Sequence, residues 1–366
     1  MKNRYYGLDI ARCIAMCGIV CLHIIGNGGV LASSSPGTIN YWMAWFLEVC
    51  AYSSVDLFAL MSGYLGFGHK RFNSYRVFEL LITVIIYCIL ITIGALIIFP
   101  KLFGSIKSII YSLAPVLKGR YWYISCYIPL SILAPFINKG LEVLTIKQHR
   151  LLCIIILLIF SAVPSIFNVD FFAITGGYSF VWLALCYIMG AYIKREKRKL
   201  CNKTTCIIIY IVCALFLLSG SILEYSIFNN TTPYMISYIS PFVLMMAISI
   251  LCLCEQITLQ RCNERIKNSL VLLSGVAFDV YIIHCHLLIF DYLIKDNFTW
   301  FLNYNAVCMP FLCIISVMGI YLFSAAFGLI RQKLFKLFQL EQFFYKITKG
   351  IFSYDISEYP SQNSSK

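Results

Sequence analysis

Residues 8–26 read L-D-I-A-R-C-I-A-M-C-G-I-V-C-L-H-I-I-G, and this stretch decides what kind of protein the chain forms. Most of its side chains are apolar, and its length is close to the ~20 residues that a helix needs to cross a bilayer. It nevertheless holds Asp9, Arg12 and His23. A charged side chain at the centre of a membrane helix costs about 3 kcal/mol on insertion scales, so these residues need partners or a function.

The spacing of these residues places two of them on one helix face. Arg12 and His23 are 11 residues apart, so at about 100° per residue they lie within ~20° of each other around the helix. The rise of ~1.5 Å per residue separates them by ~16 Å, about half the thickness of the hydrocarbon layer. Asp9 precedes Arg12 by one helical turn and is close enough to pair with it.

The composition of the whole chain indicates a membrane protein. Of its 366 residues, 60% are hydrophobic and only 12% are charged, a balance that soluble domains of this length do not have. We predict an all-α polytopic membrane protein with about ten transmembrane helices and no cleavable signal. The expected spans are about 8–26, 43–65, 77–99, 121–138, 150–168, 178–193, 205–224, 236–254, 269–290 and 306–330.

The basic residues indicate how the chain is oriented. With the N-terminus inside, 23 of the 29 Lys and Arg residues fall in inner segments and five in outer segments, while Arg12 lies within a span. Because positive charge accumulates in cytoplasmic loops, both termini are predicted to be cytoplasmic, in a multi-pass protein of the plasma (inner) membrane. The net charge of +13 is thereby explained without nucleic acid. Residues 1–330 are the predicted membrane domain, and 331–366 a cytoplasmic amphipathic helix with a loose tail.

The second expected span, 43–65, carries acidic residues. Glu48 lies at about the same depth as His23, and a carboxylate beside an imidazole fixes its tautomer and supports its protonated form. The alternative is a buried pair that only holds two helices together. Asp56 lies deeper and is expected to have a structural role, for example as a partner of Arg12.

Two further groups of residues are candidates for the same site. His284 lies in the ninth expected span at about the depth of His23, with Tyr281 one turn before it, which indicates one shared polar cavity or a buried helix contact. Arg71 and Arg76 open the third span. They suit phosphate groups, although an ordinary positive-inside loop has the same pattern.

The outer end of the fourth span and the cysteines allow weaker conclusions. Trp122 follows Arg120 there, and this pair suits either an interfacial belt or contact with a sugar ring. The 17 cysteines are mostly scattered inside the spans, and their spacing fits no standard metal site. We therefore expect no metal.

Four motifs together resemble the membrane acyltransferase family 3. They are G-L-D-I-A-R-C-I-A-M-C-G-I-V-C-L-H (7–23), S-V-D-L-F-A-L-M-S-G-Y-L (54–65), Y-W-Y-I-S-C-Y-I-P-L (121–130) and V-Y-I-I-H (280–284). The first contains an Arg and a His with ten residues between them, which resembles the family signature. The resemblance covers roughly residues 4–330. It implies ten helices, a cytoplasmic acyl-CoA donor, and O-acylation of a sugar that faces outside.

The resemblance also implies roles for single residues. His23 matches the family's proposed catalytic histidine, Arg12 the arginine paired with it, and Arg71 and Arg76 fall near its third-span arginines. We add Glu48 as the residue that orients His23. The remaining candidates, for contact with the acceptor or for support of the site, are Asp9, Asp56, Arg120, Trp122, Tyr281 and His284.

The hypothesis is an integral membrane O-acyltransferase, with acetyl as the favoured group. It moves the acyl group from acyl-CoA, a co-substrate, to a hydroxyl of a cell-envelope polysaccharide or lipid-linked sugar, and it holds no permanently bound cofactor. The alternative is a glycan exporter or secondary transporter, in which the intramembrane charges form a proton or substrate path. The two matching broken helices typical of many transporters are not apparent in the sequence.

Overall fold

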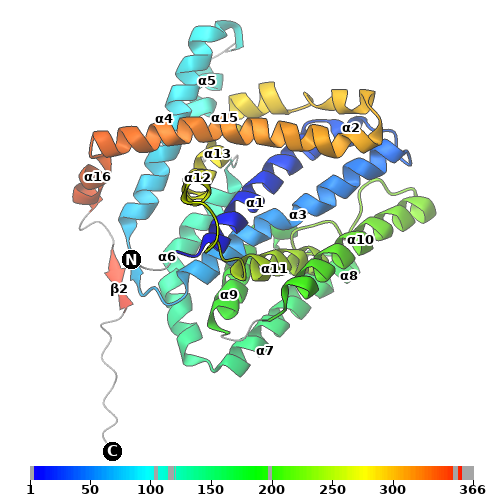
Figure 1. Ribbon diagram of the computed structural model, residues 1–366, viewed down its shortest axis with the longest axis horizontal. Helices are drawn as coiled ribbons and strands as arrows, with labels where there is room; N and C mark the ends of the chain where they lie inside the picture. Colours follow the sequence, from blue (N-terminus) through cyan, green and yellow to red (C-terminus); the bar gives the residue numbers. More distant parts are fainter. Residues whose placement is uncertain are drawn as a thin grey trace, which may run out of the picture.

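The computed structural model describes residues 4–102, 106–113, 119, 121–196, 200–348 and 353–356. This part of the chain is 80% helical and has almost no strands (Figure 1). The α-helices are α1 (Tyr6–Leu22), α2 (Val30–Ser33), α3 (Ile39–Gly66), α4 (Ser74–Ile98), α5 (Ile106–Leu113), α6 (Trp122–Val143), α7 (Ile146–Ile156), α8 (Val163–Phe167), α9 (Phe180–Arg195), α10 (Lys203–Phe228), α11 (Pro241–Glu255), α12 (Glu264–Gly275), α13 (Ala277–His284), α14 (Leu287–Ile289), α15 (Met309–Leu337) and α16 (Leu340–Thr348).

Short helical segments of other geometry and two strands complete the described elements. The π-helical segments are η1 (His23–Asn27), η4 (Leu157–Ala162) and η6 (Phe290–Ile294). The 3-10 segments are η2 (Pro100–Leu102), η5 (Thr175–Gly177), η7 (Thr299–Asn303) and η8 (Ala306–Cys308), and the strands are β1 (Arg71–Phe72) and β2 (Tyr354–Asp355), which pair antiparallel.

Within the described part of the chain, seven continuous helical segments are long and apolar enough to cross a membrane. They are Tyr6–Ser33, Ile39–Gly66, Ser74–Ile98, Trp122–Val143, Ile146–Phe167, Lys203–Phe228 and Ala306–Leu337. The chain is an all-α multi-pass membrane protein. The ninth expected span is a pair of helices, α12 and α13, bent by 42°. The sixth and eighth are α9 and α11, which have 16 and 15 residues and reach only about 22–24 Å of a ~30 Å hydrocarbon layer. The number of ten spans and the cytoplasmic termini therefore stay predictions.

Helix α3 packs against both α1 and α9, and α1 and α3 lie side by side (Figure 1). Glycines let α3 and α9 approach closely. A Cβ atom on Gly63 would lie 1.9 Å from the carbonyl oxygen of Tyr187, and one on Gly190 would lie 1.9 Å from that of Leu60. Only glycine fits at such backbone contacts, which is a common device in membrane helix packing.

The outer helices expose the apolar side chains that soluble proteins bury. On α4, Ile97 is 76% exposed, and on α15, Phe311 and Ile315 are 66% and 69% exposed. Apolar groups on the outside of a helical bundle are stable where the surroundings are lipid, so these surfaces agree with a bilayer partner.

The C-terminal part differs from its expected form in two ways. The last long helix does not end at residue 330, because α15 continues to Leu337, and the short amphipathic helix α16 follows it. Within the stretch 331–366, which is predicted to end in a loose tail, Tyr354–Asp355 forms β2 and pairs with β1. The ring of Tyr354 stacks on Phe72 with 5.4 Å between centroids. Residues 357–366 lie outside the described part.

Candidate active site

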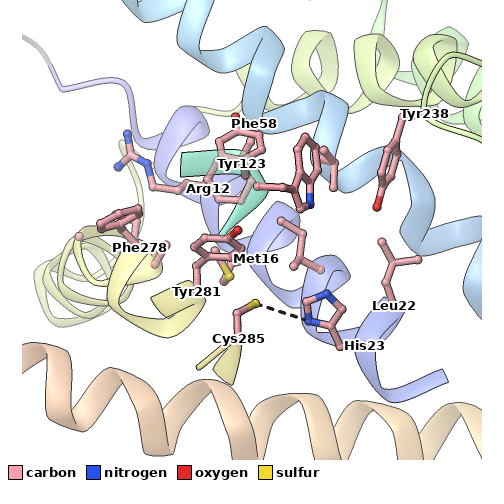
Figure 2. A pocket seen from close by; sticks show the side chains of 16 residues that line it. Arg12, Met16, Leu22, His23, Phe58, Tyr123, Tyr238, Phe278, Tyr281 and Cys285 are labelled. Atoms are coloured by element: carbon pink, nitrogen blue, oxygen red, sulfur yellow. Dashed lines mark hydrogen bonds between the residues drawn. The ribbon is translucent and has the colours of Figure 1, made fainter. Parts of the chain in front are cut away.

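A cavity of about 290 Å³ lies among α1, α3, α6 and the bent pair α12–α13. Figure 2 shows Arg12 and His23 on opposite sides of this cavity, with Met16 and Tyr281 between them. The lining residues are Arg12, Met16, Ile19, Leu22, His23, Val55, Phe58, Trp122, Tyr123, Tyr238, Ser274, Gly275, Ala277, Phe278, Tyr281 and Cys285. The cation and the imidazole that the sequence places on one helix face therefore do share one space.

A change of helix geometry positions His23. The α-helix ends at Leu22, and His23 begins the π-helical segment η1, a kind of local widening that is frequent at functional sites. The chain then turns at Gly29, whose φ of +86° is the left-handed region that suits glycine. The backbone N–H of Phe298 donates to the carbonyl of Gly28 over 2.9 Å and fixes this turn.

His23 is held by a second histidine. Nδ1 of His284 lies 2.6 Å from the carbonyl oxygen of Val280, and Nε2 of His284 lies 3.0 Å from Nδ1 of His23. A carbonyl only accepts hydrogen bonds, so Nδ1 of His284 carries a proton and its Nε2, in the neutral ring, accepts one from Nδ1 of His23. A neutral His23 then has its lone pair on Nε2. This chain of hydrogen bonds leaves His23 in the tautomer that can accept a proton at Nε2.

The two expected carboxylates are not bonded to these groups. Within the described residues Glu48 forms no hydrogen bond with His23, and its buried Oε2 has no partner. Its Oε1 packs against η1, where a Cβ atom on Gly26 would lie 3.0 Å away. Asp56 does not pair with the arginine of the first span, because its Oδ1 accepts from Nε1 of Trp182 over 2.9 Å. Neither carboxylate lines the cavity.

Asp9 is bonded mainly to residues other than Arg12. Arg4 donates to both carboxylate oxygens over 2.7 and 3.0 Å, and the hydroxyl of Ser274 donates over 2.9 Å. The contact from Arg12 is a single one of 3.4 Å. The expected pair of Asp9 and Arg12 is thus present but weak, because Arg4 takes the bidentate position. Among the described residues, the structure shows no other side-chain hydrogen bond from the guanidinium of Arg12.

The arginines of the third span separate into two positions. Arg76, at the start of α4, is exposed, and both Arg76 and Arg12 lie near enough to Tyr127 to interact electrostatically with its hydroxyl. Arg71 lies in β1 and forms an ion pair with Asp355 of β2. Arg76 and Arg12 thus both lie in the neighbourhood of Tyr127, whereas Arg71 belongs to the strand pair.

Aromatic rings surround the cavity near Trp122. Its indole stacks on Tyr238 with 6.2 Å between centroids and lies 4.7 Å from the ring of Tyr178. Tyr281 also lines the cavity. Arg120, expected beside this group, lies outside the described residues. Flat apolar ring faces of this kind are suited to stacking against a sugar ring.

Sequence reasoning missed several lining residues, in particular Tyr238, Ser274, Phe278 and Cys285. Cys285 directly follows His284, and this position next to a candidate residue was the one sequence feature that could have identified it as a lining residue. The others carry no motif, since they come from segments that approach His23 only in the folded chain.

These features define a class of protein: a multi-pass membrane protein whose apolar helices enclose a cavity with a hydrogen-bonded histidine pair and a cation. A family model described as an acyltransferase domain matches residues 5–338, nearly the whole chain. The chain belongs to acyltransferase family 3 and is a membrane acyltransferase that moves groups other than aminoacyl groups. No curated protein and no solved structure matches it. Family membership supports the enzyme over the transporter.

Proposed function

We propose that this membrane acyltransferase moves an acyl group, acetyl by preference, from acyl-CoA to a hydroxyl of a cell-envelope polysaccharide or lipid-linked sugar at the plasma (inner) membrane. The proposal rests on one observation: Arg12 and His23 line the same cavity, and Nδ1 of His23 is hydrogen-bonded to Nε2 of His284. It combines a site for an anionic donor with a proton acceptor in one space. The acyl-CoA donor is a co-substrate, and no permanently bound cofactor is part of the proposal.

In the proposed reaction His23 is the general base. Its Nε2 takes the proton of the sugar hydroxyl while the oxygen forms a bond to the thioester carbonyl carbon. The carbon–sulfur bond then breaks, and the leaving CoA sulfur takes the proton back from His23. His284 is a positioning residue, since it accepts from Nδ1 of His23 and thereby keeps the lone pair at Nε2. A route through an acyl-His23 intermediate uses the same residues and stays open.

The size of the cavity supports a binding mode in which only one part of the acyl-CoA donor enters the cavity. Its volume of about 290 Å³ is at the lower end of small-molecule sites, which span ~300–1,000 Å³. It suits an extended pantetheine arm better than a whole nucleotide. The phosphates then stay near Arg12 and Arg76, and the thioester reaches His23 over the ~16 Å that separate it from Arg12 along the helix. Arg71, which forms an ion pair with Asp355, is given no contact with the donor in this proposal.

The aromatic group at Trp122 supports a sugar as the acceptor. The rings of Trp122, Tyr178 and Tyr238 form a packed set, and two of these residues line the same cavity as His23. A sugar stacked there would offer a hydroxyl to Nε2 of His23. Glu48 has no contact that assigns it a step, so the proposal gives its expected orienting role to His284.

The test uses the full-length protein in lipid nanodiscs with acetyl-CoA labelled in the acetyl group. We expect CoA release that depends on an added envelope glycan or lipid-linked sugar, with the label recovered on the sugar by mass spectrometry. His23→Ala should abolish transfer but still bind acetyl-CoA. His69→Ala, a change of an exposed histidine outside the cavity, is the matched control. Release of CoA that no glycan accelerates would argue against the proposal.

A further inference from the structure

Three side chains able to ligate a metal ion meet beside the cavity. Nδ1 of His23, Nε2 of His284 and Sγ of Cys285 all lie within 4.8 Å of one another. The two nitrogens are 3.0 Å apart, and the sulfur lies 3.5 Å from the nitrogen of His284 and 3.8 Å from that of His23. Both His284 and Cys285 are buried, whereas His23 is partly exposed.

This triangle has nearly the dimensions of a tetrahedral zinc site. With zinc–nitrogen bonds of about 2.05 Å and a zinc–sulfur bond of about 2.3 Å, ligand nitrogens lie about 3.3 Å apart and nitrogen lies about 3.6 Å from sulfur. The observed separations of 3.0, 3.5 and 3.8 Å differ from these values by a few tenths of an ångström.

Two further observations point to a ligand at this place. Nδ1 of His284 donates to the carbonyl of Val280, and metal-bound histidines are held in this way, with the second nitrogen bonded to a backbone or carboxylate oxygen. His23 and Cys285 also line the cavity, so two of the three candidate ligands border a space that offers room for an ion and a fourth ligand. Three protein ligands and one open position are the pattern of an accessible zinc site.

We propose that His23, His284 and Cys285 bind a zinc-like divalent ion, and that the bound ion stops acyl transfer. Binding releases the thiol proton of Cys285, because the thiolate is the ligand. It also takes the lone pair of Nδ1 of His23, so the ring proton moves from Nδ1 to Nε2. His23 then has no lone pair for a sugar hydroxyl. This second part, inhibition, rests on the proposed function, whereas the binding of the ion does not.

The binding test uses the full-length protein in detergent, stripped with a chelator and titrated with Co²⁺. Cobalt bound to a thiolate gives a charge-transfer absorption, and we expect about one equivalent with this band, displaced by Zn²⁺. Cys285→Ala should abolish the band and weaken zinc binding at least tenfold, and His284→Gln should also weaken it. Cys186→Ala, a change of a buried cysteine away from the cavity, should keep both.

Thermal unfolding of each variant shows that it is folded before its metal binding is compared. An undiminished thiolate band in folded Cys285→Ala protein would overturn the site. So would a folded wild-type protein that binds no cobalt or zinc at micromolar free ion.

The activity test measures the rate of each protein with Zn²⁺ relative to its own rate with a chelator. We expect at least tenfold inhibition of the wild-type protein, reversed by the chelator, and at most twofold inhibition of Cys285→Ala. Stimulation by Zn²⁺, or equal inhibition of both proteins, would contradict the inhibitory role. If no acceptor supports transfer, the proposed function fails, while the cobalt spectra still decide whether the site exists.

Discussion

Replacement of His284 tests whether the second histidine controls the first. His284→Phe keeps an aromatic ring, although a somewhat larger one, but removes the acceptor for Nδ1 of His23, so the proton is free to move to Nε2. A buried hydrogen-bonding group left without its partner costs about 1–3 kcal/mol. Because 1.36 kcal/mol corresponds to a factor of ten in rate, kcat should fall by about 5- to 150-fold. His284 does not line the cavity, so the KM for acyl-CoA should stay within about twofold.

A matched variant separates this effect from lost packing. His284→Gln keeps a carbonyl oxygen that can accept from Nδ1 of His23, so it should recover most of the turnover that His284→Phe loses. The assay is steady-state CoA release by the protein in nanodiscs, with thermal unfolding of the same samples. A stably folded His284→Phe protein with wild-type kcat would refute the tautomer argument. So would equal losses in both variants.

Three further expectations follow from other contacts. Arg12→Ala should weaken acyl-CoA binding by about tenfold with little change of Tm, whereas Arg4→Ala should lower Tm because it removes the bidentate cation from the buried carboxylate of Asp9. Calorimetric titration and thermal unfolding test both changes, and the reverse outcome would make Arg12 structural. Glu48→Gln should keep kcat within about tenfold, and a loss of about 10² or more in folded protein would return Glu48 to the reaction. Ser35→Cys in a cysteine-free chain should react with an impermeant thiol probe from outside and His69→Cys only from inside, while the opposite labelling would invert the predicted topology.

Much of the architecture was predictable because a bilayer imposes strong local conditions on sequence. A run of about 20 consecutive apolar residues predicts a membrane span without knowledge of the rest of the fold. Seven of the expected spans are such helices in the structure. The short α9 and α11 and the bend between α12 and α13 were not predictable in this way. Their lengths and breaks depend on the neighbouring helices that cover them, and hydropathy averages over such details.

The ion pairs could not be assigned from the sequence. Spacing along α1 made Arg12 the obvious partner of Asp9, but Arg4, from the segment before the helix, reaches the carboxylate with better geometry. Depth matching suggested Glu48 as the partner of His23, but depth leaves rotation around the helix axis free. The same depth argument also indicated His284, and here the structure brings the two side chains together.

The sequence by itself determined that this is a helical membrane protein, which family it resembles, and that Arg12 and His23 share one face of the first helix. These conclusions rest on composition, local spacing and motifs, and these features can be recognised without knowing how distant segments pack together. Only the tertiary structure decided what His23 touches, because His284 and Cys285 are more than 260 residues away in the chain. Their meeting depends on how α13 packs against α1, and that packing is a sum of many small contacts that no single stretch encodes.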